Sequence, residues 1–260
     1  GRAYAAAITS LMSAVSYRRS AEIAGVVGPY DGYAVNKIPH DEVMDMHRAE
    51  AHGLVSVLNS EPGGVFVEPG MVAPFHLANE IAMVANREWE RNLEVGEMYG
   101  WRNAQASLLA PAGTISFMMD SDTTGVEPDF SLVKFKKMVG GGSLQIVNSQ
   151  VPEALRSLGY GEQTIKEIEE YIIEHGNVEG APGLAREHYD VFDCAVGDRA
   201  ISAMGHIKMM AAVQPFLSGA ISKTVNIPES ATVEEIEEVY YRGWELGLKA
   251  IAVYRDNCKV

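Results

Sequence analysis

The sequence is poor in cysteine and in basic residues, and each shortage excludes a class of protein. Its 260 residues include two cysteines, Cys194 and Cys258, which form no CxxC pair. A disulfide framework is therefore not expected, and a reduced, cytoplasmic setting is predicted. Lysine and arginine number 21 against 35 aspartate and glutamate residues, which gives a net charge of -14. This balance argues against the broad basic face of a nucleic-acid-binding protein.

The chain also lacks an apolar run long enough to cross a membrane, because Arg, Glu, Lys or Gly interrupts each candidate. A composition of 47% hydrophobic and 22% charged residues is that of an ordinary globular protein. The apolar start of the chain has no basic leading region and keeps a helical rhythm as far as Gly28-Pro29. It therefore predicts a helix and not a signal peptide. Because there is no initiator methionine, we expect a segment of a longer protein.

The periodicity of apolar residues predicts helices separated by short strands. A helix C-terminus is expected at Gly176, and Thr232 with Glu235 forms a capping-box pattern. The final strand, helix and strand are typical of a βαβ unit, which favours a parallel sheet or barrel. The predicted helices cover residues 2–27, 41–58, 74–99, 162–175, a segment broken near Pro215 and one after Thr232, and the predicted strands cover 103–110, 222–227 and 250–254.

A tight turn, Pro111-Ala112-Gly113-Thr114, follows the first predicted strand. Ligands of parallel α/β folds bind at the carboxyl ends of strands, where helices begin. The glycine lets the backbone approach a ligand, and successive N–H groups from Ala112 to Ile115 suit a phosphate. No lysine follows as in a Walker motif, so an ordinary strand-to-helix turn remains the alternative at this point.

Other candidate sites carry weaker signals. Asp120 to Gly125 has the residue types of a calcium loop but not its spacing, so an Asx turn is favoured. Gly140-Gly141-Gly142 is interpreted as a hairpin loop. His175 and His206 stand alone and are predicted to be structural residues. Cys194 has no His–Asn pattern beside it and is predicted to be a small buried residue.

Several stretches taken together resemble the catalytic subunit of ribonucleotide reductase, of the adenosylcobalamin-dependent class (class II). They occur in one order along nearly the whole chain, which makes the resemblance more specific than any one motif. The stretches are "RNAQ", "LLAPAGTISFMMDSDTTGVEPDFSLVKFKKMVGGGS", "FDCA", "HIKMMAAVQPFLSGAISKTVNIP" and "GLKAIAVYRDNCK".

The resemblance implies that residues 1–260 form one segment, the C-terminal part of a ten-stranded α/β barrel that is incomplete in this chain. It implies a radical enzyme that uses adenosylcobalamin to reduce ribonucleotides, with a diphosphate substrate favoured. A thioredoxin-type or dithiol reductant, the N-terminal part of the same enzyme and a second copy in a homodimer are the expected partners. The family's Pro-Thr-Gly-Thr-Ile phosphate loop matches Pro111, Ala112, Gly113, Thr114 and Ile115, with alanine in place of the usual threonine.

Two departures from the family pattern limit what the chain does by itself. The finger-loop pattern Asn-x-Cys-x-Glu, which carries the radical cysteine, is absent, so no catalytic residue and no metal ligand is assigned here. Val253 stands where class I enzymes have the first of two adjacent relay tyrosines, with only Tyr254 following, which favours cobalamin. A non-catalytic nucleotide-binding fragment, a partner subunit of a split reductase and a class I piece remain alternatives.

Overall fold

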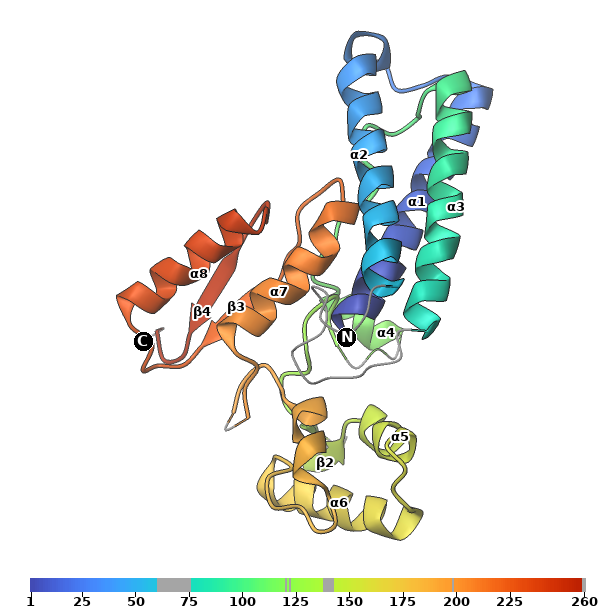
Figure 1. The fold of residues 1–260 in the computed structure, drawn as a ribbon. Coiled ribbons are helices and arrows are strands. Elements are labelled where there is room, and N and C mark those ends of the chain that lie inside the picture. The colour runs from blue at the N-terminus through green and yellow to red at the C-terminus, as the bar shows by residue number, and fades with distance from the viewer. Residues whose placement is uncertain (60–75, 120, 122, 138–142, 198, 259–260) are drawn as a thin grey trace. The chain divides into compact units, whose positions relative to one another are not determined.

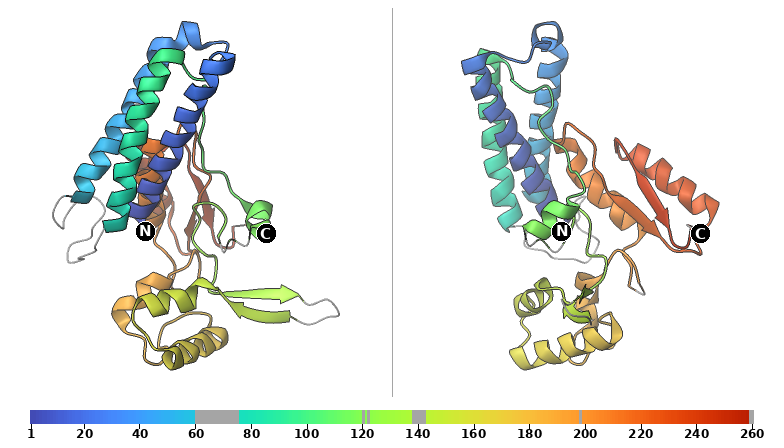
Figure 2. Two further views of the ribbon diagram at one scale, coloured as in Figure 1. Left: turned by 90° about the vertical axis from the view of Figure 1, so that its right-hand side faces the viewer. Right: turned by 180° about the vertical axis from the view of Figure 1, so that it is seen from behind.

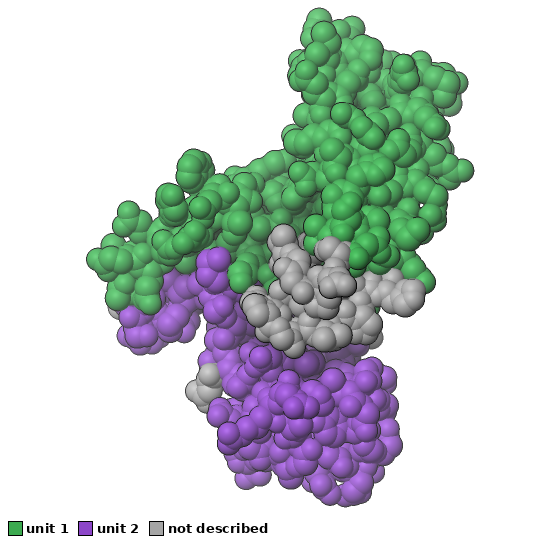
Figure 3. All heavy atoms as spheres, in the orientation of Figure 1, with its two compact units in different colours: residues 1–109, 207–222, 232–252 green, residues 110–206, 223–231, 253–260 purple. Residues whose placement is uncertain are grey.

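The computed structural model describes residues 1–59, 76–119, 121, 123–137, 143–197 and 199–258. These residues form two compact units (Figure 3). Unit 1 comprises residues 1–109, 207–222 and 232–252, and unit 2 comprises residues 110–206, 223–231 and 253–260. Among the described helices, none is both long enough and apolar enough to cross a bilayer.

Three long helices build most of unit 1: α1 (Arg2–Val27), α2 (Tyr33–Asn59) and α3 (His76–Tyr99). They run side by side in every view (Figures 1 and 2). The buried face of α1 consists mainly of alanine and serine, which let the α3 backbone approach closely. Larger side chains, among them Tyr17, Met44 and Trp89, complete this core.

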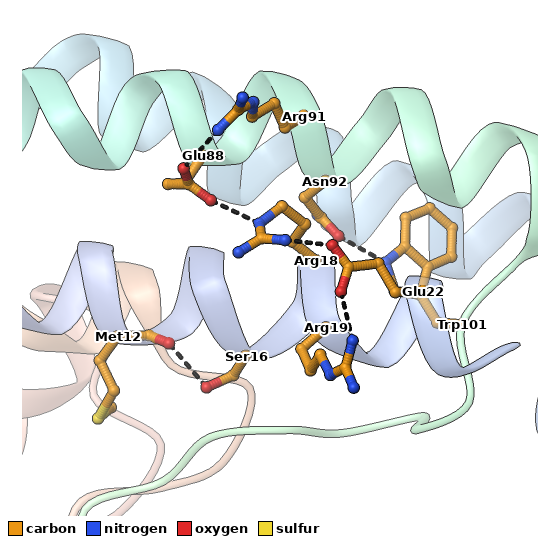
Figure 4. A network of polar contacts seen from close by, with 9 residues as sticks. All are labelled: Met12, Ser16, Arg18, Arg19, Glu22, Glu88, Arg91, Asn92 and Trp101. Atoms are coloured by element: carbon orange, nitrogen blue, oxygen red, sulfur yellow. Dashed lines mark hydrogen bonds and ion pairs between the residues drawn. The ribbon is translucent and has the colours of Figure 1, made fainter. Parts of the chain in front are cut away.

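Polar contacts fix α1 against α3 at the edge of the bundle (Figure 4). The Arg18 guanidinium donates from Nε to Glu88 Oε2 at 2.6 Å and also pairs with Glu22. At the right of the same view, the buried Trp101 indole donates to Asn92 Oδ1 at 2.7 Å. The carboxylates and the amide oxygen therefore each have a donor, so the bundle edge holds no unpaired charge at these positions.

The start of α2 differs from the prediction. The predicted helix begins at Asp41, yet α2 begins at Tyr33 and passes through Pro39, a residue that disfavours helix interiors. Tertiary packing explains the difference: the rings of Tyr33 and His40 pack against Trp101, with centroids 6.1 Å and 4.9 Å away. Such contacts outweigh a local propensity. In contrast, α1 has the predicted bounds, and α3 is described from His76 to the predicted end at Tyr99, with residues 74 and 75 outside the described part of the chain.

The remaining elements of unit 1 are shorter. Most of α7 (Ala203–Val213) belongs to it, followed by the 3-10 turn η2 (Gln214–Phe216), which contains the predicted break at Pro215. Helix α8 (Val233–Glu245) begins at the predicted capping box: Glu235 N–H donates to Thr232 Oγ1 at 3.2 Å, and Thr232 N–H donates to Glu235 Oε2 at 2.8 Å.

Unit 2 is organised around an antiparallel hairpin and two helices. Strands β1 (Val133–Lys137) and β2 (Ser143–Val147) pair with Val133 opposite Val147. Helix α5 (Gln150–Ser157) and α6 (Glu162–His175) follow, and Gly176 ends α6 in the left-handed conformation, as predicted. Isoleucines on one face of α6 and Leu155 of α5 form the core. The 3-10 helix η1 (Arg186–Phe192) completes the unit.

The described residues are mostly helical, with four strands in two two-stranded sheets. The second sheet pairs β3 (Thr224–Ile227) with β4 (Ala252–Arg255), so the predicted order of strand, helix and strand is present. The strand predicted at 103–110 is wrong: only an isolated parallel bridge joins Leu109 to Ile221. A ten-stranded barrel is not seen in the described part of the chain.

Candidate phosphate-binding turn

The segment that leads to the predicted phosphate turn is anchored within unit 1 by a neighbouring stretch of backbone. Gly219 N–H donates to the Ser107 carbonyl at 2.8 Å, and Ser222 N–H donates to the Leu109 carbonyl at 2.8 Å. A Cβ on Gly219 would lie 2.8 Å from the Leu108 Cβ, so this close approach requires glycine. Residues 107–109 are therefore held in place within unit 1 by residues 219–222.

Hydroxyl groups and one lysine support that path. Ser13 Oγ of α1 donates to Ser107 Oγ at 2.9 Å, and Ser218 Oγ donates to the Ser107 carbonyl at 3.1 Å. The Lys249 ammonium donates to the carbonyls of Leu217 and Ser218 at 3.0 Å and 2.8 Å. Each of these backbone carbonyls thus accepts a hydrogen bond, as buried backbone polar groups generally do.

The turn itself is the start of a short helix, α4 (Gly113–Met118). Ala112 is its N-cap and supplies no side-chain hydrogen bond. Ser116 N–H donates to the Ala112 carbonyl at 2.9 Å, which makes the preceding amides, those of Gly113, Thr114 and Ile115, the first-turn donors. Such amides have no carbonyl partner inside their own helix, and the side chain of Ile115 is 64% exposed. The arrangement leaves donors available to an anion.

Gly125 lies against the base of the turn, a role that the sequence did not predict. Its φ is +68°, and a Cβ at this position would lie 2.6 Å from the Ala110 carbonyl oxygen. Both facts require glycine here. Asp120 and Asp122 of the same predicted Asx turn lie outside the described residues, and no cluster of three metal-binding side chains is found among those that are described.

A buried polar cluster follows Gly125 and was missed by the sequence analysis. Glu127 Oε1 accepts from Thr224 N–H at 2.7 Å, and its Oε2 accepts from Lys223 Nζ at 3.0 Å. Lys223 Nζ also donates to His206 Nδ1 at 2.5 Å and to the Thr224 carbonyl at 3.1 Å. Lys223 and His206 are 3% and 1% exposed. Because Glu127 is 96 residues from Lys223 in sequence, no local pattern indicates this cluster.

The electrostatics of the cluster define its protonation. Burial, and after it the Lys223 charge, together lower the pKa of His206 to about 4, so the imidazole is neutral near pH 7. Burial also lowers the pKa of Lys223, whereas the Glu127 carboxylate raises it. The three acceptors around Nζ match the three protons of an ammonium group. His206 therefore carries its proton on Nε2, which is buried without a partner among the described residues.

The other predicted residues are placed as follows. Cys194 is buried, as predicted, and burial raises the pKa of its thiol to about 11, which disfavours a thiolate nucleophile. His175 stacks on Tyr171 with ring centroids 3.9 Å apart, in agreement with a structural role. Val253 and Tyr254 both lie on β4. Gly140 to Gly142 fall outside the described residues.

Comparisons with known proteins identify the family. The sequence model of the family "Ribonucleotide reductase, barrel domain" matches residues 1–254. The chain belongs to this family. It is 60% identical over 260 residues to the vitamin B12-dependent ribonucleotide reductase of Streptantibioticus cattleyicolor, covering 100% of this chain and 41% of that protein. The enzyme of the same description from Rhodopirellula baltica is 49% identical over 262 residues, covering 99% of this chain and 23% of the relative.

Two further similarities are more distant. A vitamin B12-dependent ribonucleoside-diphosphate reductase of Mycobacterium tuberculosis is 37% identical over 155 residues, or 59% of this chain and 21% of that protein. The solved class Id ribonucleotide reductase alpha subunit of Actinobacillus ureae has a TM-score of 0.46 and 24% identity, over 70% of this chain and 33% of that one. The chain thus spans less than half the length of each of these curated relatives.

Proposed function

We propose that this chain is part of an adenosylcobalamin-dependent ribonucleotide reductase, an oxidoreductase that makes deoxyribonucleotides by thiyl-radical chemistry. The observation that carries the proposal is whole-chain identity of 60% and 49% to two relatives described as vitamin B12-dependent ribonucleotide reductases. In the complete enzyme, the chain forms the C-terminal part of a ten-stranded α/β barrel. The matched barrel family supports this placement.

Within that enzyme, we assign residues Pro111 to Ile115 to the binding of the substrate's phosphates. The first-turn amides of α4 support the assignment, because Ala112 leaves them without a side-chain cap. A chain with a net charge of -14 exerts no general attraction on an anion. Local backbone donors at a helix start are therefore the expected means of holding phosphates.

The substrate is proposed to be a ribonucleoside diphosphate. The description of the Mycobacterium tuberculosis relative names a ribonucleoside-diphosphate reductase, and the family resemblance also favours the diphosphate. A thioredoxin-type or dithiol reductant would re-reduce the complete enzyme after each turnover.

The described residues offer no assembled set of cobalt ligands. Among the imidazoles that could ligate cobalt, those of His40, His47 and His206 are buried within the protein. The imidazoles of His52, His175 and His188 already contact Glu90, Tyr171 and Tyr160. No group of three His, Cys, Asp or Glu side chains is assembled in the described part of the chain. Adenosylcobalamin is therefore proposed as the cofactor of the complete enzyme, with no residue of this chain assigned to it.

A second candidate function concerns the chain by itself: a nucleotide-binding fragment, or one subunit of a split reductase. Two observations favour it. Cys194 is buried with a raised pKa, and the sequence contains no Asn-x-Cys-x-Glu pattern. A class I piece is disfavoured because Val253 and Tyr254 do not form a tyrosine pair on β4.

The proposed function is tested with a charge placed in the turn of the complete enzyme. A Cβ on Gly113 would meet nothing within 4 Å, so Gly113→Glu and its control Gly113→Ala both fit sterically. With adenosylcobalamin and a dithiol, Gly113→Glu should raise the KM for a ribonucleoside diphosphate by about tenfold or more, because like charges repel. Gly113→Ala adds bulk without charge and should raise the KM less than Gly113→Glu does.

Two results would contradict the proposal. If Gly113→Glu and Gly113→Ala gave the same KM, the phosphates would bind elsewhere. If the complete enzyme made deoxynucleotides only with a separate radical-generating protein and without cobalamin, the class I alternative would replace the class II assignment.

A further inference from the structure

The Glu127 carboxylate joins two segments of unit 2 that are distant in sequence. One oxygen accepts from the first amide of β3, that of Thr224, and the other accepts from Lys223 Nζ. The Glu127 side chain is 17% exposed and that of Lys223 is 2% exposed, so the pair is largely protected from solvent. Because screening by water is weak there, the pair holds its geometry more strictly than a surface pair does.

The same short segment reaches the base of the phosphate turn. Gly125 precedes Glu127 by two residues and lies against the Ala110 carbonyl, immediately before Pro111. Moving Glu127 would therefore move the backbone on which Ala110 rests. Since protein interiors are close-packed, such a shift is transmitted to the neighbouring backbone.

His206 completes the arrangement around the ammonium group. Its Nδ1 accepts the third Nζ proton, after those given to Glu127 and to the Thr224 carbonyl. With all three protons used, Nζ has one favoured position, and a change of side-chain rotamer that moved Nζ would break three hydrogen bonds. The lysine is thus fixed from three sides.

We propose that Lys223 and Glu127 are positioning residues for the substrate's phosphates: their buried pair, completed by His206, holds Gly125 against Ala110 and so fixes the start of α4. This inference rests on the proposed function, since it assumes that the phosphates bind at Pro111 to Ile115. Neither side chain is required to touch the nucleotide. Both act through the backbone of the turn.

The experiment uses the complete enzyme with the variant Lys223→Met and a matched control, Arg156→Met. Arg156 also belongs to an ion pair of unit 2, with Glu162 at 2.6 Å, but that pair is exposed and remote in sequence from the turn. The readouts are KM and kcat for a ribonucleoside diphosphate, inhibition by inorganic pyrophosphate, and the melting temperature. Pyrophosphate isolates the phosphate contacts because it has neither ribose nor base.

Lys223→Met should raise both the KM and the pyrophosphate inhibition constant by about tenfold, because misplaced donors bind less tightly. The kcat should change less, since the lost phosphate contacts are made equally in the ground state and in the transition state. Arg156→Met should change neither constant. A melting temperature that falls in Lys223→Met while both constants stay unchanged would overturn the inference and leave the pair a purely structural role.

A second variant keeps the test decisive if Lys223→Met does not fold. Glu127→Gln has nearly the same shape but offers one amide oxygen to two donors, Thr224 N–H and Lys223 Nζ, so a partial rise in both constants is expected. Unchanged constants in a folded Glu127→Gln enzyme would also overturn the inference. The Gly113→Glu result separates the two failures: if that variant binds normally, the proposed phosphate turn itself is wrong.

Discussion

Ala112 is the residue of the candidate phosphate turn at which the chain departs from the family pattern. As the N-cap of α4 it contributes its backbone and no side-chain hydrogen bond. A threonine here would add a hydroxyl beside the first-turn amides, whereas alanine leaves binding to the backbone alone. A substitution at this position therefore distinguishes the contribution of the backbone to phosphate affinity from that of a side chain.

Ala112→Thr in the complete enzyme should tighten binding of a ribonucleoside diphosphate by about tenfold, the low end for a hydrogen bond to a charged group at roughly 1.5–3 kcal/mol. The low end is expected because threonine at an N-cap also bonds amides of its own helix. Equilibrium binding measures the change, and Ala112→Val, branched without a hydroxyl, is the control. Equal affinity for threonine and alanine would mean that the backbone donors suffice.

At the scale of elements, the sequence predicted what depends on local signals. Helix α1 has the predicted bounds, α6 ends at Gly176, and the capping box of Thr232 begins α8, because caps and periodicity act within a few residues. The strand at 103–110 failed for the opposite reason. A strand exists only where a partner lies beside it, and here the partner at 219–222 forms a single bridge.

The residues of the candidate site also fall into two groups: those that a local sequence pattern indicates and those that only the tertiary fold brings together. Pro111 to Ile115 could be proposed from the sequence because the turn is contiguous and the family motif covers it, and their role stays a prediction. His206 was predicted to be a structural residue, and its burial agrees, but its contact with Lys223 was not foreseen. The cluster joins Glu127, His206 and Lys223 through the tertiary fold, and nothing in the spacing of these residues indicates it.

Two helical glycines give a matched test of packing in the three-helix bundle. A Cβ on Gly96 of α3 would lie 1.9 Å from the buried Trp101 ring, whereas a Cβ on Gly53 of α2 would meet nothing within 4 Å. Gly96→Ala should lower the free energy of unfolding by about 1–3 kcal/mol through overpacking. Gly53→Ala should raise it by about 0.5–1 kcal/mol, since alanine favours a helix.

Urea unfolding followed by tryptophan fluorescence measures both changes, with Trp101 reporting on its own surroundings in Gly96→Ala. Shifts of the unfolding midpoint in the same direction for the two variants would contradict the described packing of α3 on Trp101. The comparison needs no assumption about function.

At the scale of the whole chain, we expect the residues for binding phosphates to be present and the residue that starts the reaction to be absent. The candidate phosphate turn of the chain begins helix α4, whose first-turn amides receive no hydrogen bond from the Ala112 side chain. Such amides are suited to binding an anion. Its cysteines are Cys194, which is buried, and Cys258, which is exposed near the end of β4. Neither lies in the sequence pattern of the radical cysteine, so under the proposed function the chain would hold a nucleotide's phosphates without supplying the group that reacts with its ribose.

The chain by itself should therefore form no deoxynucleotide when given a ribonucleoside diphosphate, adenosylcobalamin and a dithiol. The expected reason is chemical: hydrogen abstraction from ribose needs a thiyl radical held next to the sugar, whereas Cys194 is buried in the core of unit 2 and neither cysteine lies in an Asn-x-Cys-x-Glu pattern. Chromatographic detection of deoxynucleotide measures the outcome, with the complete enzyme as the positive control. Product formed by the pure chain would contradict this prediction. It would show that Cys194 or Cys258 reaches the ribose and is a catalytic residue.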